Sequence, residues 1–173
     1  HVLSAWARKY IDTTDATADT ESNGAVEGVR TRTGSGFRTT IQAGPHDMVA
    51  DEPESYGGTD TGPTPYDLLL ASLGTCTGMT LRMYADHKDL PLDEAVVHLS
   101  HEKVHAKDCE ECTSESGKVD RIERTIEIHG DLTEKQRARM MEIADKCPVH
   151  RSLHSEIHVV SHRQDPEPAP ASS

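Results

Sequence analysis

Residues 65–87, PYDLLLASLGTCTGMTLRMYADH, are apolar or small at nearly every position. Thr64 and Pro65 open the segment with a helix-capping residue and a proline at the first helical position, which predicts a long α-helix. A helix without a polar face is usually buried on all sides. In a chain of 173 residues this requires further layers or a partner subunit around the helix. Gly74 and Gly78 cost about 1 kcal/mol each relative to alanine, so we expect another backbone to approach them.

Strand-like segments lie on both sides of the predicted helix. Hydrophobic alternation and turn residues predict strands within 25–43, where a turn at 33–36 separates two of them, and over 45–51, 95–105, 119–129 and 157–162. Thr133 begins a capping-box pattern that predicts an amphipathic helix to about Lys146, and Pro148 ends or kinks that helix. This order predicts an α+β fold in which curved, mainly antiparallel sheets pack on long buried helices.

Composition limits the organisation and the partners. We expect a peripheral segment over 1–24, one domain over 25–163 and a disordered tail over 164–173. The net charge of −12 leaves no basic footprint for nucleic acid, and no apolar run reaches the roughly 18–20 residues of a membrane span. Positions 1–20 carry charge and lack the apolar core of a signal peptide, so we expect a cytoplasmic protein. There, cysteines are more often reactive, metal-bound or buried than paired in structural disulfides.

Two cysteines occur in the predicted helical regions. Cys76 lies too far inside its helix for the N-terminal dipole to lower its pKa, and a free cysteine in such a place is often a small buried hydrophobe. Cys147 stands beside Lys146, His150 and Arg151, and cations favour a thiolate. From position alone, each cysteine fits a structural or a reactive role.

Cys109 and Cys112 form a CxxC pair with His105 nearby. This spacing suits two zinc ligands, although the chain holds no second CxxC to complete a site. A reducible local disulfide and a plain acidic hairpin are the alternatives. We therefore expect no firm metal site, with zinc at Cys109 and Cys112 as an open alternative.

Two long segments resemble a known family. They are GGTDTGPTPYDLLLASLGTCTGMTLRMYA (57–85) and IERTIEIHGDLTEKQRARMMEIADKCPVHRSL (122–153), and each carries one cysteine. They are similar to the osmotically inducible protein C / organic hydroperoxide resistance (OsmC/Ohr) family, and closest to its branch with "GGxDxGPxPYDLLLAALGACT" and "ADKCPVHRTL" signatures. The resemblance covers roughly 28–162.

The resemblance implies an intertwined homodimer that reduces organic hydroperoxides in oxidative-stress defence. Cys76 would be the peroxidatic cysteine and Cys147 the resolving cysteine, with a dithiol as reductant and no other cofactor. Apolar side chains around Cys76 (Leu69, Leu73, Met79 and Met83) would favour organic over inorganic peroxides.

The sequence departs from the family pattern at the start of the helix. Peroxidase members carry Asn-Pro-Glu ten residues before the first cysteine, and the Glu holds an activating arginine. Here Tyr66 takes the place of the Glu and Asp67 comes one residue later, about 100° further round the helix. Arg38 and Asp67 are our candidates for the activating pair, with Arg30 and Arg32 in the same strand region. Two other functions stay open: a pocket for another small apolar or thiol compound, and a metal-stabilised structural protein using Cys109 and Cys112.

Overall fold

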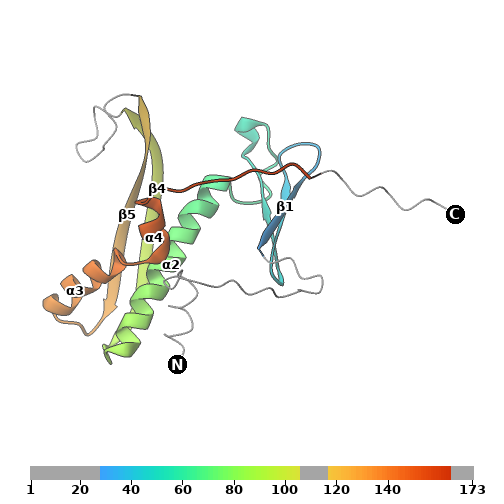
Figure 1. Ribbon diagram of the computed structural model, residues 1–173. Coiled ribbons are helices and arrows are strands. Elements are labelled where there is room, and N and C mark those ends of the chain that lie inside the picture. The colour runs from blue at the N-terminus through green and yellow to red at the C-terminus, as the bar shows by residue number, and fades with distance from the viewer. Residues whose placement is uncertain (1–27, 106–116, 165–173) are drawn as a thin grey trace.

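The computed structural model describes residues 28–105 and 117–164 (Figure 1). Its elements, in chain order, are β1 (Val29–Thr33), β2 (Thr39–Ala43), β3 (His46–Ala50), the short 3-10 helix η1 (Glu54–Tyr56), α2 (Pro65–His87), β4 (Leu92–His105), β5 (Lys118–Gly130), α3 (Glu134–Ala144) and α4 (Pro148–Leu153). All strand pairs are antiparallel, so the predicted mixed α+β class with antiparallel sheets is confirmed.

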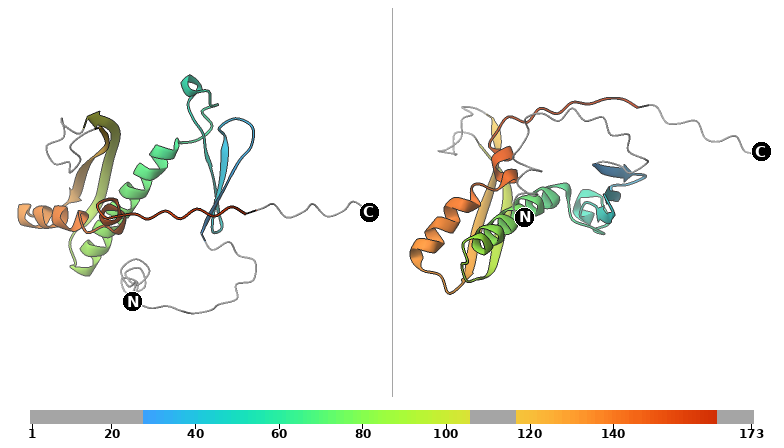
Figure 2. Two further views of the ribbon diagram at one scale, coloured as in Figure 1. Left: turned by 45° about the horizontal axis from the view of Figure 1, so that its top comes forward. Right: turned by 60° about the horizontal axis from the view of Figure 1, so that its bottom comes forward.

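The first sheet has the order β1-β2-β3. Ile41 in the central strand pairs with Thr31 on one side and Met48 on the other. The predicted turn at 33–36 separates β1 from β2, and the three expected strands are all present. Figure 2 shows this sheet beyond the N-terminal end of α2, apart from the second sheet.

A buried carboxylate organises the loop between this sheet and α2. Asp51 is 2% exposed, and its two oxygens accept hydrogen bonds from the backbone N–H of Glu52 and from both the N–H and the hydroxyl of Thr59 and Thr61. These bonds hold the pKa of Asp51 well below its ordinary value, mainly through the Thr59 hydroxyl. The loop that enters α2 is therefore fixed by polar contacts.

Helix α2 begins as the sequence predicts. The Thr64 hydroxyl accepts a hydrogen bond from the Asp67 N–H, and the Asp67 carboxylate accepts one from the Thr64 N–H in return. The fully buried residues of α2 form a single stripe at four-residue spacing, made of Leu73, Thr77, Leu81 and Ala85. In the described part of one chain, β4, α3 and α4 cover only part of the helix (Figure 1), so the predicted burial on all sides still requires further layers or a partner subunit.

Among residues 28–105 and 117–164, the two glycines of α2 do not meet another backbone. A Cβ on Gly74 would lie 2.8 Å from the Leu99 side chain, whereas one on Gly78 would meet nothing within 4 Å. The predicted approach of a backbone is thus replaced by a side-chain contact at Gly74 and by open space at Gly78.

The second sheet is the long β4–β5 ribbon, which packs against α2. Along β5 the half-buried residues alternate with exposed ones, as the isoleucine spacing predicts. The hydrophobic core lies between this ribbon, α2 and α3, and its fully buried members include Leu81, Ala85, Met140 and Ala144. Neither α2 nor any other helix in the described part of the chain has the length and hydropathy of a bilayer-spanning segment.

The predicted closing strand over 157–162 is wrong for the single chain. Residues 155–164 contain no strand, and Ile157 and Val159 are 60% and 77% exposed. This segment runs from α4 back toward the first sheet (Figures 1 and 2). A strand requires a neighbour for its backbone hydrogen bonds, and the segment has none within the described residues.

Candidate functional site

The Cys147 thiol is a neighbour of the Cys76 thiol and one of the groups that raise its pKa, and α4, which begins after Cys147, packs against α2. Cys76 is half-buried in the middle of α2, and Cys147 is completely buried where α3 gives way to α4. Pro148 follows as the first residue of α4, which gives Cys147 an extended backbone with ψ of 130°. The helical path is thus interrupted between α3 and α4, at the residue that carries the second thiol.

The surroundings of Cys76 favour the protonated thiol. Burial, followed by the hydrogen bond to Cys147, raises the pKa of Cys76 to about 11. The backbone N–H of Val149 and the Thr80 hydroxyl act in the opposite direction, but more weakly. Within the described part of one chain, Cys76 is therefore a poor nucleophile at neutral pH.

Arg124 connects the two segments that carry the cysteines. Its Nη1 donates to the hydroxyl of Thr77 at 3.1 Å and to the Ala144 carbonyl at 3.3 Å, and its Nη2 donates to Asp145 Oδ1 at 2.7 Å. Our sequence interpretation missed this residue. The signal was its place on β5, because Arg124 occurs in the same alternating phase as Ile122 and Ile126, where an apolar side chain would be expected.

A pocket of about 490 Å³ lies between α2, the β4–β5 ribbon and α4, and neither Cys76 nor Cys147 is among its lining residues. Leu73, one turn before Cys76, and His150, next to Val149, both lie in its wall. The side chains around it combine apolar and polar groups: Tyr66, Leu69, Leu73, His101, Asp120, Ile122, Arg124, His150, Leu153 and His154. The pocket can take a small, partly apolar molecule.

The polar wall of this pocket contains two stacked rings. The Tyr66 ring lies flat on the His101 imidazole, and His101 Nε2 lies 2.8 Å from Asp120 Oδ1. The same oxygen is 3.1 Å from Lys103 Nζ, and these two partners, His101 first, lower the pKa of Asp120. Asp120 is therefore held as a carboxylate. The predicted methionines do not line this pocket, because Met79 is 58% exposed and Met83 is absent from the wall.

A family model described as OsmC-like protein matches residues 58–162, which includes both cysteines and most of the pocket. The chain belongs to the OsmC-like protein family. No curated protein matches the chain.

Solved structures of OsmC-like proteins share the fold. An OsmC-like protein from Mycoplasma pneumoniae superposes with a TM-score of 0.59 at 18% identity, covering 73% of this chain and 85% of that one. The organic hydroperoxide resistance protein OsmC of Legionella pneumophila gives a TM-score of 0.54 at 17% identity, covering 72% and 86%. OhrB of Bacillus subtilis, an organic hydroperoxide resistance protein, gives 0.51 at 19%, covering 72% and 87%. The fold is thus that of the OsmC/Ohr proteins.

The candidate activating residues of this OsmC-like chain lie apart from Cys76. Arg38 is exposed in the loop between β1 and β2. Asp67 caps α2, and its Oδ2 accepts from both the N–H and the hydroxyl of Thr64, at 2.9 Å and 2.7 Å. In the described part of the chain both bonds end on Oδ2, so Oδ1 can still accept from a guanidinium.

Cys109 and Cys112 lie outside the described residues. Within 28–105 and 117–164, no group of three His, Cys, Asp or Glu side chains is arranged to hold a metal ion. The zinc alternative therefore stays a prediction.

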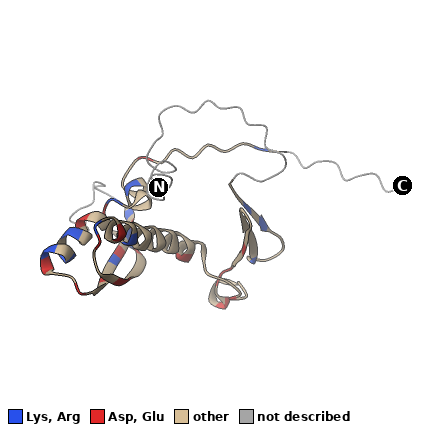
Figure 3. Cartoon of the chain, turned by 90° about the horizontal axis from the view of Figure 1, so that it is seen from below, with Lys and Arg blue, Asp and Glu red and all other residues tan. Residues whose placement is uncertain are grey.

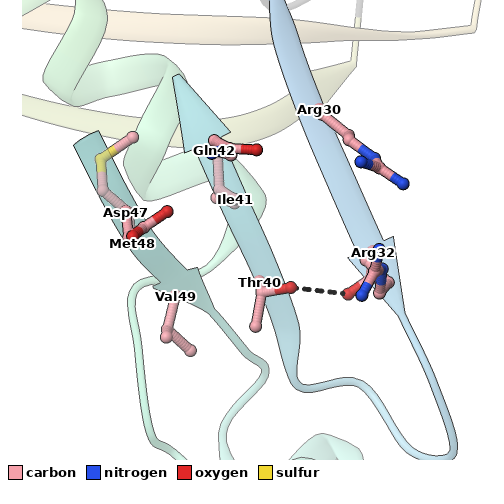
Figure 4. A pocket seen from close by; sticks show the side chains of 8 residues that line it. All are labelled: Arg30, Arg32, Thr40, Ile41, Gln42, Asp47, Met48 and Val49. Atoms are coloured by element: carbon pink, nitrogen blue, oxygen red, sulfur yellow. Dashed lines mark hydrogen bonds between the residues drawn. The ribbon is translucent and has the colours of Figure 1, made fainter. Parts of the chain in front are cut away.

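A second pocket opens on the face of the first sheet (Figure 4). Arg30 and Arg32 stand along β1, and Met48 and Asp47 belong to β3, with the Thr40 hydroxyl donating to the Arg32 carbonyl at 3.5 Å. It lies on a different sheet from the one that packs against α2, the helix that carries Cys76. We therefore assign the chemistry to the pocket at the cysteine pair.

Proposed function

We propose that this protein is a thiol-dependent peroxidase that reduces organic hydroperoxides. The observation that carries the proposal is that Cys76 and Cys147 are neighbouring thiols, and that α2 and α4 beside them line a pocket with leucine walls. Cys76 is the peroxidatic cysteine and Cys147 the resolving cysteine. The solved relatives named for organic hydroperoxide resistance support the same assignment through the shared fold.

The reaction proceeds in three balanced steps. The Cys76 thiolate attacks the O–O bond of the hydroperoxide and takes one oxygen, so that Cys76 becomes a sulfenic acid. The other fragment leaves as an alkoxide and takes up a proton to give the alcohol. The Cys147 thiol then displaces water from the sulfenic acid and forms the Cys76–Cys147 disulfide. A dithiol reduces this disulfide by exchange and becomes a disulfide itself. Because Cys147 is a neighbour of Cys76, resolution competes well with over-oxidation.

The first step requires a thiolate, and a pKa of about 11 keeps the Cys76 thiol protonated in the single chain. A cation near the sulfur would lower that pKa. Arg38 is our candidate for this cation and Asp67 Oδ1 for its acceptor.

We propose that a second copy of the chain covers the part of α2 that a single chain leaves exposed. A groove between α2 and β4 has small residues on its α2 side, which are Ala71, Gly74, Thr75 and Gly78, and Glu94 is the one charged residue in its lining. Figure 3 shows that most of α2 carries no charge, in contrast to α3. The exposed Val159 and Val160 also have no neighbouring strand within the described part of the chain. A homodimer would cover these surfaces and bring further groups to Cys76.

Peroxidase assays test the proposal directly. With dithiothreitol as the dithiol, the protein should consume cumene hydroperoxide, and Cys76→Ser should abolish this turnover. Cys147→Ser should allow one turnover and then accumulate sulfinic acid on Cys76, visible by mass spectrometry. Cys112→Ser is the matched control and should retain activity. Absence of turnover in the unaltered protein would contradict the proposal.

The raised pKa of Cys76 favours a second candidate function. A protonated thiol near a half-apolar pocket that it does not line suits binding or processing of another small apolar or thiol compound without peroxide turnover. In that case the purified protein would retain a small ligand, which native mass spectrometry would detect. The ligand would be lost when Leu69 or Leu73 is replaced by a charged residue.

A further inference from the structure

Arg124 is largely shielded from solvent, with 13% of its side chain exposed, and all its described partners belong to the segments around the two cysteines. One end of the guanidinium reaches Thr77, the residue after Cys76 on α2. The other end reaches Asp145, two residues before Cys147. One rigid planar group thus spans the gap between the two thiol-bearing segments.

The contact at Ala144 ties Arg124 to Cys147 itself. The Ala144 carbonyl accepts from Arg124 Nη1 at 3.3 Å and from the backbone N–H of Cys147, also at 3.3 Å. His150 Nδ1 lies 2.9 Å from the Asp145 carbonyl, which fastens the same turn to α4. The backbone that places the Cys147 sulfur is therefore held from β5 and from α4.

Asp145 neutralises the charge of Arg124 at a point where burial would otherwise be costly. Its carboxylate is 63% exposed, so the ion pair extends from the interior to solvent. A single ion pair of this kind adds little stability on its own. Arg124 therefore acts mainly through the geometry of its three contacts and less through its charge. These contacts tie α2 to the turn before α4.

We propose that Arg124 is a positioning residue that holds Cys147 against Cys76 for disulfide formation. The inference rests on the proposed cycle of these two cysteines and adds a residue that the sequence motifs do not single out. Closing the disulfide from two held thiols is an intramolecular step, and such steps are sensitive to displacements of about 1 Å.

The test measures the thiol–disulfide equilibrium without any hydroperoxide. In a Cys109→Ser/Cys112→Ser background, the protein is equilibrated with reduced and oxidised glutathione. Two protein thiols and one oxidised glutathione give the Cys76–Cys147 disulfide and two reduced glutathiones. Arg124→Ala should lower this equilibrium constant at least tenfold, equivalent to about 30 mV. Arg124→Lys should recover only part of the loss, since an ammonium does not reproduce the planar fork.

Arg121→Ala is the matched control on the same strand, because Arg121 is half-exposed and pairs with Glu102 and Glu123 at the surface. It should leave the equilibrium constant within twofold. Thr77→Val removes one acceptor of Arg124 at nearly constant volume, and it should shift the equilibrium in the same direction as Arg124→Ala. Thr77→Val decides the matter if Arg124→Ala does not fold.

Two results separate this inference from the peroxidase proposal. A folded Arg124→Ala protein, or Thr77→Val in its place, with an unchanged equilibrium constant would overturn the positioning role, even if the unaltered protein reduces hydroperoxides. A tenfold shift in a protein that reduces no hydroperoxide would support the positioning role and remove only the peroxidase proposal. A lowered melting temperature alone, with an unchanged constant, would assign Arg124 to fold stability and overturn the inference.

Discussion

The Tyr66 ring is stacked on the His101 imidazole, with ring centroids 4.1 Å apart and an angle of 11° between the planes. This contact joins the first turn of α2 to β4 and forms one wall of the pocket beside the cysteines. Tyr66 occupies the place where the peroxidase members that this chain resembles carry a Glu. At this position the chain has a packing contact in place of an acid.

Replacing Tyr66 should therefore alter substrate binding. Tyr66→Ala removes a stacking contact of about 0.5–1.5 kcal/mol, so KM for cumene hydroperoxide should rise severalfold while kcat changes little. Tyr66→Phe preserves the stack and should resemble the unaltered protein. The measurement is steady-state kinetics with cumene hydroperoxide and with hydrogen peroxide, whose KM should not respond. Equal loss in both variants would assign the effect to the hydroxyl.

Asp51 should govern the acid stability of the loop before α2. Its pKa is lowered by folding from an ordinary value of 3.8, so its stabilising contribution is present above that pH and is lost as the pH falls further. Asp51→Asn should lower Tm by roughly 5 °C or more at pH 7. The difference from the unaltered protein should shrink below about pH 4 in thermal melts. Asp47→Asn, at an exposed site on β3, is the control and should change Tm little.

Local sequence patterns predicted most of the elements. The Thr64-Pro65 start, the Thr133 capping box and the alternation along β5 each specify a boundary or a face through contacts within a few residues, and the structure confirms these elements. The strand over 157–162 failed for the opposite reason. Its alternation is real, but a strand also requires a neighbour, which no local pattern supplies.

In the candidate site, too, local patterns predicted some features, and others depend on contacts between elements that are distant in the sequence. Motifs singled out Cys76 and Cys147, but their contact depends on how α2 meets the turn before α4. Arg124 was missed because its role comes from acceptors on two other elements, Thr77 on α2 and Asp145 after α3. Of the four apolar residues predicted around Cys76, Leu69 and Leu73 line the pocket, whereas Met79 and Met83 do not. Helical spacing alone does not say which face of α2 is covered.

The acidity of Cys76 provides a test of the activating arginine. In the single chain its pKa is raised to about 11. A guanidinium beside the sulfur stabilises the thiolate, so the assembled protein should titrate well below that value. Arg38→Ala should return the midpoint toward 11 and slow peroxide reduction at neutral pH. Thiolate absorbance at 240 nm, read in the Cys109→Ser/Cys112→Ser background, measures the midpoint.

Arg30→Ala, on the same sheet, is the matched control for Arg38→Ala and should leave the midpoint unchanged. A midpoint near 11 in the unaltered protein as well would contradict the activating role of Arg38. It would favour the ligand-binding function over the peroxidase.

Gly78 tests whether a second copy covers α2. A Cβ at this position meets nothing within 4 Å in one chain, so Gly78→Ala in a monomer should stabilise the helix by about 1 kcal/mol. If a second copy packs there, Gly78→Leu should separate the chains and halve the mass measured by light scattering. Met141→Leu, at another exposed apolar site, is the control. A monomeric mass for the unaltered protein would contradict the homodimer.

The five hydrogen bonds to Asp51 have a consequence for temperature. Hydrophobic burial loses strength on cooling, so a junction held only by apolar packing loosens in the cold. The connection between the first sheet and α2 is held instead by a carboxylate and the threonines around it. Near freezing, the entry to the cysteine-bearing helix should keep its shape better than the Leu81–Met140 core does.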